Sequence, residues 1–162
     1  MSHIAEYGSY LNGVDRDLFM QALMTVAESE GVPLAQDIDS YDEGDNVSSW
    51  EDQELLCAIR TKDLPQGLGV YLQVDDAGKL KPVFVADKLW LAETTTGLNR
   101  DDVRFSALEK ASENGMQRLQ AAVEKTYVAL AYAVAMAKLG YKVQSTASEG
   151  AYIMRGTKEV AR

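Results

Sequence analysis

Apolar positions near the N-terminus recur at helical spacing. They follow one another at intervals of three and four and are Leu18, Phe19, Ala22, Leu23 and Val26. This pattern predicts a helix over about 16–30 with one apolar face. Either Asn12 or Asp15 is suited to cap its start, because a short side-chain oxygen accepts from free amide groups. Gly31 is expected to end the helix, and Pro33 blocks its continuation.

A second and longer apolar pattern predicts a helix from about 115 to 139, which Gly140 ends. Its stripe consists of Leu119, Val123, Tyr127, Leu130 and Val134. The middle of this helix, 129–136, has almost no polar face. A helix that is apolar all round is usually buried on more than one side. We therefore expect it to lie across a sheet with a partner subunit on its back, and its interface residues to be Leu119, Val123, Leu130, Tyr132 and Val134.

The remaining patterns predict strands. The strongest is a hairpin of 68–74 and 81–86 around the turn Asp75-Asp76-Ala77-Gly78, where glycine is available for a positive φ angle. Further strands are expected at 2–11 and 55–59, a short edge strand at 34–40, and a final hairpin of 141–145 with 151–154. The segment 93–112 is polar and irregular and is expected to be a mobile loop with one helical turn near 103–110.

These elements follow the order β-α-β-β-β-α-β. The simplest packing is an α+β fold with an antiparallel sheet and two helices on one face, a ferredoxin-like variant. With 162 residues and no linker or internal repeat, the chain is expected to form a single domain over 1–162.

Charge changes this picture locally. The formal net charge is −9, and no Lys or Arg interrupts the eight acidic residues between Asp37 and Glu54. From Met116 onward the balance reverses to seven Lys or Arg against three Glu. The acidic total argues against direct binding to nucleic acid or to an anionic membrane surface. No cleavable signal peptide is visible, and the longest apolar run, 126–137, is too short to cross a bilayer. A cytoplasmic protein is expected.

The sequence contains few residues or motifs that are typical of a catalytic site. His3 is the only histidine, and Cys57, the only cysteine, lies in an apolar run typical of a core thiol. No Walker A loop or Gly-x-Gly-x-x-Gly is present, and adjacent carboxylates such as Asp75 and Asp76 fall in expected turns. The sequence therefore predicts no catalytic residue and no cofactor, and it favours a protein that is not an enzyme.

The acidic stretch supplies oxygen ligands, the kind that Ca²⁺ and Mg²⁺ prefer. One Cys and one His are too few for the usual zinc site. The segment 37–42 begins like an EF-hand loop, but Tyr41 occupies the fifth position and Asp42 stands where the turn needs glycine. No metal ligands are predicted, although a weak divalent-ion site stays open for this segment.

Three residues are the candidates for ligand contact. Asp87 and Trp90 close the central hairpin, and Tyr127 lies on the long helix. Packing at the edge of the core is the alternative for Trp90, and packing within the core is the alternative for Tyr127. A pocket between sheet and helices would draw on these side chains.

Several short motifs resemble a Ycf-type family of small proteins from cyanobacteria and red-algal plastids, whose function is not defined. They are Met1-Ser2-His3-Ile4, Ala86-Asp87-Lys88-Leu89-Trp90, Lys125-Thr126-Tyr127 and Gly140-Tyr141-Lys142-Val143. The Ala-Asp to Trp spacing is one residue longer than the commoner one, and the acidic segment and the 93–112 loop resemble expansions. The resemblance implies no activity. It implies an accessory role, because some relatives are encoded beside ATPases of the AAA+ type.

Three functions remain open at this point. The first is a non-enzymatic binding or accessory protein that pairs with a protein partner or with itself as a homodimer. The resemblance implies an AAA+ type ATPase as one such partner. The second is a sensor or sequestering protein for a small ligand, a nucleotide or a metabolite. The third is an acidic inhibitor that imitates nucleic acid through the base-free run at 37–54.

Overall fold

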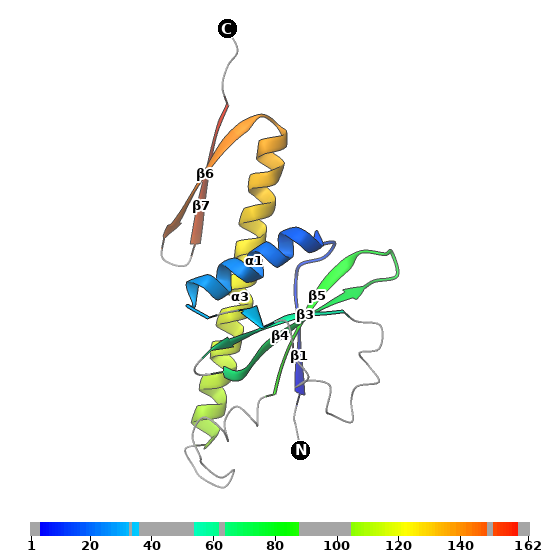
Figure 1. The fold of residues 1–162 in the computed structure, drawn as a ribbon, viewed down its shortest axis with the longest axis vertical. Helices are drawn as coiled ribbons and strands as arrows, with labels where there is room; N and C mark the ends of the chain where they lie inside the picture. Colours follow the sequence, from blue (N-terminus) through cyan, green and yellow to red (C-terminus); the bar gives the residue numbers. More distant parts are fainter. Residues whose placement is uncertain are drawn as a thin grey trace.

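The computed structural model describes residues 4–32, 34–35, 54–61, 64–87, 105–148 and 151–158. These residues form two helices and seven strands in two sheets (Figure 1). In chain order the elements are β1 (Ile4–Gly8), α1 (Arg16–Ser29), β2 (Leu34–Ala35), β3 (Glu54–Thr61), β4 (Leu64–Val74), β5 (Leu80–Asp87), α3 (Phe105–Lys138), β6 (Tyr141–Ser148) and β7 (Ala151–Lys158).

The main sheet is antiparallel and has the strand order β1-β5-β4-β3-β2. Its centre is the predicted hairpin, which is confirmed as β4 and β5. The turn forms because the Asp75 carboxylate accepts hydrogen bonds from the amides of Ala77 and Lys79. Gly78 supplies the positive φ of 75°. Strand β1 then pairs with β5 at one edge of this hairpin, opposite Phe84 and its neighbours.

Both helices cover the same face of the main sheet. Alternate residues of β4 and β5, such as Leu68, Val70 and Phe84, enter one buried cluster with Phe19 of α1 and Leu119 of α3. The other face carries a smaller buried group, Tyr71, Val83 and Val85. Side chains alternate across a strand, which explains the division. The expected α+β class, an antiparallel sheet with two helices on one face, is confirmed.

The ferredoxin-like connection is not confirmed. Among the described residues, the strands that follow α3 do not join the main sheet. Instead β6 and β7 pair only with each other, in register from Tyr141 with Lys158 to Ser148 with Ala151. The final hairpin is therefore present and longer than the pattern predicted.

Helix α3 is also longer than predicted. It begins at Phe105, so the helical turn expected near 103–110 is helical from residue 105, and the loop expected over 93–112 is wrong for residues 105–112. Residues 93–104 lie outside the described residues. The missed turns contain Ala107, Leu108, Glu109 and Lys110, which are strong helix formers. Their apolar residues are too few to display a stripe, and Gly115 suggested a boundary, although the helix continues through it.

The second half of α3 projects beyond the main sheet, and the β6–β7 hairpin folds back along it (Figure 1). Residues 128–139 together with β6 and β7 are called the extension below. The rest of the described chain, which contains the main sheet, α1 and the first half of α3, is called the body.

Candidate binding surfaces

The core of the body ends where the extension begins. Met116, Leu119 and Val123 on α3 are almost completely buried. One turn later, Val128 is 46% exposed, and Tyr132 and Leu139 follow at 47% and 63%. The sequence 128–137 nevertheless contains no charged residue, and its one polar group is the Tyr132 hydroxyl. An apolar helix surface is thus exposed to solvent in the single chain, which soluble monomers usually avoid over large areas.

Four exposed apolar residues form a stripe along α3 and the residue after it, whereas Val134, which is also 42% exposed, lies on another side of the helix. Val128, Tyr132, Ala135 and Leu139 are separated by four, three and four residues, which places them on one side of a helix. We call these four residues the back stripe. They lie opposite the face that Leu119 and Val123 direct into the core. The back stripe is thus an apolar surface that the body does not cover.

The hairpin covers a different side of the helix. Gly156 of β7 lies against Met136, because a Cβ atom built on this glycine would stand 2.7 Å from the Met136 Cε. The inward strand positions Tyr141 and Val143 are partly buried, whereas Ile153 on the outward face is exposed. The hairpin therefore shields the Met136 side of α3 and leaves the back stripe accessible.

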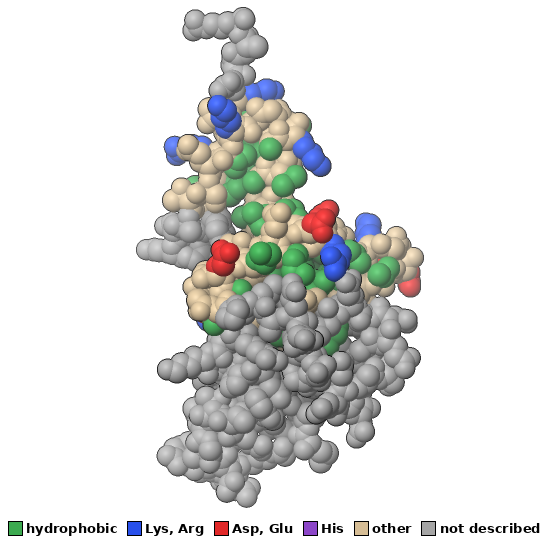
Figure 2. Space-filling view, in the orientation of Figure 1, with side chains coloured by type: hydrophobic (Ala, Val, Ile, Leu, Met, Phe, Trp, Pro, Cys, Tyr) green, Lys and Arg blue, Asp and Glu red, His purple; other side chains and the backbone are tan. Residues whose placement is uncertain are grey.

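The extension is basic although the protein is acidic. Its described residues include Lys138, Lys142, Arg155 and Lys158, and no Asp or Glu. Figure 2 shows Lys and Arg side chains around the projecting end, with hydrophobic side chains between them. Residues 125–162 hold six Lys or Arg against two Glu, whereas residues 1–124 hold ten against 23 Asp or Glu. The net charges are therefore +4 and −13.

The predicted interface residues divide between core and surface. Leu119 and Val123 are fully buried in the core of the single chain. Leu130 is partly buried, and Tyr132 and Val134 are exposed. The prediction did not include Val128 and Leu139, because it took the interface residues mainly from the stripe that begins at Leu119. A second heptad-like stripe in the same sequence was the signal that identifies them.

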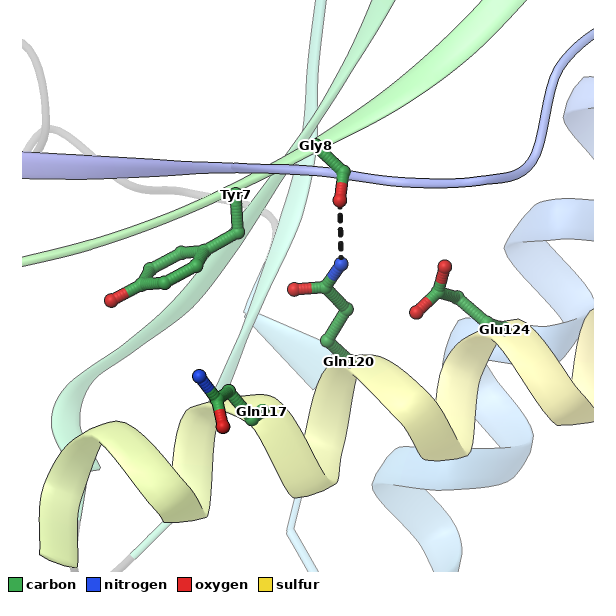
Figure 3. A pocket seen from close by; sticks show the side chains of 5 residues that line it. All are labelled: Tyr7, Gly8, Gln117, Gln120 and Glu124. Atoms are coloured by element: carbon green, nitrogen blue, oxygen red, sulfur yellow. Dashed lines mark hydrogen bonds between the residues drawn. The ribbon is translucent and has the colours of Figure 1, made fainter.

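A second surface feature is a cavity between β1 and α3. It has a volume of about 430 Å³, opens to solvent and is lined by Tyr7, Gly8, Gln117, Gln120 and Glu124 (Figure 3). The Gln120 Nε2 donates to the Gly8 carbonyl at 3.0 Å, which leaves the amide oxygen of this side chain turned into the cavity. Its lining is thus mostly polar.

Glu124 is the charged group of this cavity. It is only 7% exposed, and one of its oxygens accepts from the Ser9 hydroxyl at 2.7 Å. The same Ser9 oxygen accepts from the Leu11 amide at 3.1 Å. A buried carboxylate needs such partners, because desolvation of a charge costs several kcal/mol. Sequence reasoning missed Glu124, since a single Glu in a long helix is typical of a solvated position.

Of the three predicted ligand contacts, Tyr127 is not among the residues that line this cavity. Tyr127 lies in the body, where its hydroxyl accepts from the Asp15 amide at 2.9 Å and its ring packs edge-on against Phe19. Asp87 is the last residue of β5 and pairs with Ile4 of β1 in the sheet register. Trp90 lies outside the described residues. Whether these three residues contact a ligand stays a prediction.

Several other predictions fall outside the described residues as well. They concern His3, the Cys57 side chain and the acidic run at 37–53, so the nucleic-acid mimic stays a hypothesis of the sequence. Within the described part of the chain, no helix has both the length and the apolar character that a bilayer span needs. Among the same residues, no three His, Cys, Asp or Glu side chains are grouped as metal ligands.

The described residues define an α+β domain that carries a basic, apolar helix-and-hairpin extension. No family model matches the chain, and neither the curated proteins nor the solved structures contain a significant match.

Proposed function

We propose that this chain is a non-enzymatic binding or accessory protein that binds another polypeptide through the extension. The observation that carries the proposal is the exposed back stripe, three of whose four residues lie on the uncharged segment 128–137. Burying such a stripe removes apolar area from water, which is the main driving force of protein association. A helix face with anchors at i, i+4, i+7 and i+11 is a common form of protein-recognition surface.

The charge of the extension favours an acidic protein partner. Lys138, Lys142, Arg155 and Lys158 surround the apolar residues in the manner of a polar rim around an interface core. A nucleic acid would meet the −13 of residues 1–124 as well as the +4 of residues 125–162, and the net repulsion disfavours it. The resemblance to proteins encoded beside AAA+ type ATPases adds one proposed class of partner.

A photo-crosslinking experiment tests this function in cells that express the protein. A photoreactive amino acid replaces Tyr132 in one version and Tyr10 in another. Both tyrosines are exposed, but Tyr10 lies on the body. The proposal predicts adducts with a polypeptide from position 132 and none from position 10. An absence of adducts at 132, or equal adducts at both positions, would overturn it. Mass spectrometry of the adduct decides between an ATPase and a second copy.

The polar cavity supports a second candidate function, the binding of a small cationic ligand. Glu124 supplies a negative charge of low exposure, and the Gln120 amide oxygen is an additional acceptor. Amine or guanidine groups carry the donors that such acceptors need. This function is independent of the extension.

Thermal unfolding with putrescine, spermidine, agmatine and arginine tests the cavity. A ligand at about 100 times its Kd stabilises a protein by about 2.7 kcal/mol, which is a measurable rise in Tm. The rise is expected in the unmodified chain and not in Glu124→Gln. A panel that leaves Tm unchanged, or raises it equally in both, contradicts this function.

A further inference from the structure

We propose that the polypeptide bound by the extension is a second copy of this chain, paired antiparallel along α3. The inference rests on the proposed function, because it names the partner of the same surface. Two observations support it: the spacing of the back stripe itself, and the opposite net charges of residues 125–162 and 1–124.

The same periodicity extends toward the N-terminus of α3, but there Gln117 and Glu124 line the cavity next to β1 of the same chain. Gln117, Ala121 and Glu124 precede Val128 at intervals of four, three and four. Alternating intervals of three and four are the pattern by which one helix packs along another. Only the second half of this seam is apolar, so two copies bury the most apolar area when their back stripes overlap.

Antiparallel overlap matches the back stripe to itself. It places Val128 of one copy opposite Leu139 of the other, and Tyr132 opposite Ala135. A large side chain then meets a small one at the centre, which suits close helix packing. Parallel overlap instead places Tyr132 against Tyr132 and brings the two Lys138 residues together. Like charges at such close range are unfavourable.

The same register brings opposite charges together. The basic tip of the extension, with Lys138 and Lys142, comes to lie near residues 125–129 of the other copy, where Lys125 is exposed. Glu124 precedes Lys125 and is only 7% exposed, so the attraction comes from the net charges of the two segments, +4 over 125–162 and −13 over 1–124, rather than from one ion pair. Each basic extension thereby approaches an acidic body, and the two equivalent contacts close the pair with two-fold symmetry.

Sedimentation equilibrium of the full chain tests the pairing. The unmodified protein is expected at twice its 17.8 kDa. Val128→Glu and Tyr132→Glu are expected to sediment as monomers with unchanged helix content, since both positions are exposed in the single chain. Met24→Glu is the matched control, because Met24 is 49% exposed on α1 of the body, and it should remain dimeric. Monomeric unmodified protein at about 100 µM, which is far above a micromolar Kd, overturns the proposal.

Cysteine crosslinking tests the orientation. Val128→Cys and Leu139→Cys chains are prepared separately, mixed and treated with a short bismaleimide. Antiparallel pairing predicts a product between the two variants that exceeds the product of either variant alone. Stronger self-crosslinking of each single variant would indicate parallel pairing and contradict the proposal. Unmodified protein, with Cys57 as its only thiol, gives the background.

The two proposals fail in distinguishable ways. Adducts of position 132 with a different protein, together with monomeric purified chain, would end the self-pairing and leave the binding function standing. An absence of any adduct at 132 in cells, together with monomeric purified chain, would end both.

Discussion

The Tyr127 hydroxyl connects the two helices of the fold through a single hydrogen bond. It accepts from the amide of Asp15, the residue that caps α1 by accepting from the Leu18 amide at 2.9 Å. One side chain of α3 thus holds the start of α1 in place. Capping by Asp15 was one of two alternatives in the sequence, whereas this use of Tyr127 was not foreseeable, because its partner is 112 residues away.

Tyr127→Phe is expected to reduce the free energy of unfolding by about 1 kcal/mol, the usual net value of one hydrogen bond. Urea unfolding followed by circular dichroism measures the change. Tyr10→Phe removes the same atom from an exposed ring and should leave stability unchanged. Equal stability of the two variants would show that the Tyr127 hydroxyl does not stabilise the contact.

A hydrogen bond from Ser9, the residue after β1, to Glu124 joins this end of the strand to α3. In Ser9→Ala the Glu124 carboxylate loses its hydrogen-bond donor while staying buried. The expected loss is about 1–3 kcal/mol, since an unsatisfied buried acceptor bears its desolvation cost. The double variant Ser9→Ala with Glu124→Leu removes the orphaned charge and should recover part of the loss. A double variant that is no more stable than Ser9→Ala would contradict this explanation of the loss.

At the scale of elements, local signals predicted most of the fold. These signals act within a few residues, and they are the α1 stripe, the Asp75 turn and the glycines at 31 and 140. Helix α1, the β4–β5 hairpin and the ends of both helices lie where these signals predicted them. The separate β6–β7 sheet and the burial of Leu119 and Val123 depend on which element packs on which, and no local pattern contains that information. The start of α3 was missed for a related reason, since helix formers without a stripe resemble a polar loop.

Alanine substitution is expected to change stability in opposite directions at two glycines, one within α3 and one just after it. Gly140 follows the helix with a φ of 86°, so Gly140→Ala is expected to cost about 1 kcal/mol. Gly115 lies within the helix, and a Cβ there would meet nothing within 4 Å. Gly115→Ala should therefore stabilise the protein by about 0.5–1 kcal/mol. Chemical unfolding of both variants measures the two signs, and equal signs would contradict the assignment of their backbone roles.

The contact between Gly156 and Met136 holds the hairpin against α3. A branched side chain in Gly156→Val should separate the hairpin from α3. Its Cβ would stand 2.7 Å from the end of the flexible Met136 side chain, which has to move, and its two methyl groups need further room on the same face. Faster amide exchange across β6 and β7 is the expected result, since a two-stranded sheet alone is marginally stable. Thr157→Val, on the outward face, is the matched control. Unchanged exchange in Gly156→Val would show that the hairpin does not depend on this contact.

At the scale of the whole molecule, the chain separates its charges along its length. Residues 1–124 carry a net charge of −13, and residues 125–162 carry +4. The basic segment contains the apolar stripe that the single chain leaves exposed. The sequence predicted a partner on the back of the long helix but placed it partly on core positions. We propose the back stripe as the interaction surface instead, and the central claim is that a second copy of the chain covers it.

Hydrogen exchange of the unmodified chain at two concentrations tests that claim most directly. Samples at about 1 µM and about 100 µM bracket a micromolar Kd. If a second copy covers the back stripe, the amides of residues 128–139 exchange more slowly at the higher concentration, while those of α1 are unchanged. Exchange of residues 128–139 that is the same at both concentrations, in protein shown by sedimentation to be monomeric at both, would contradict the account.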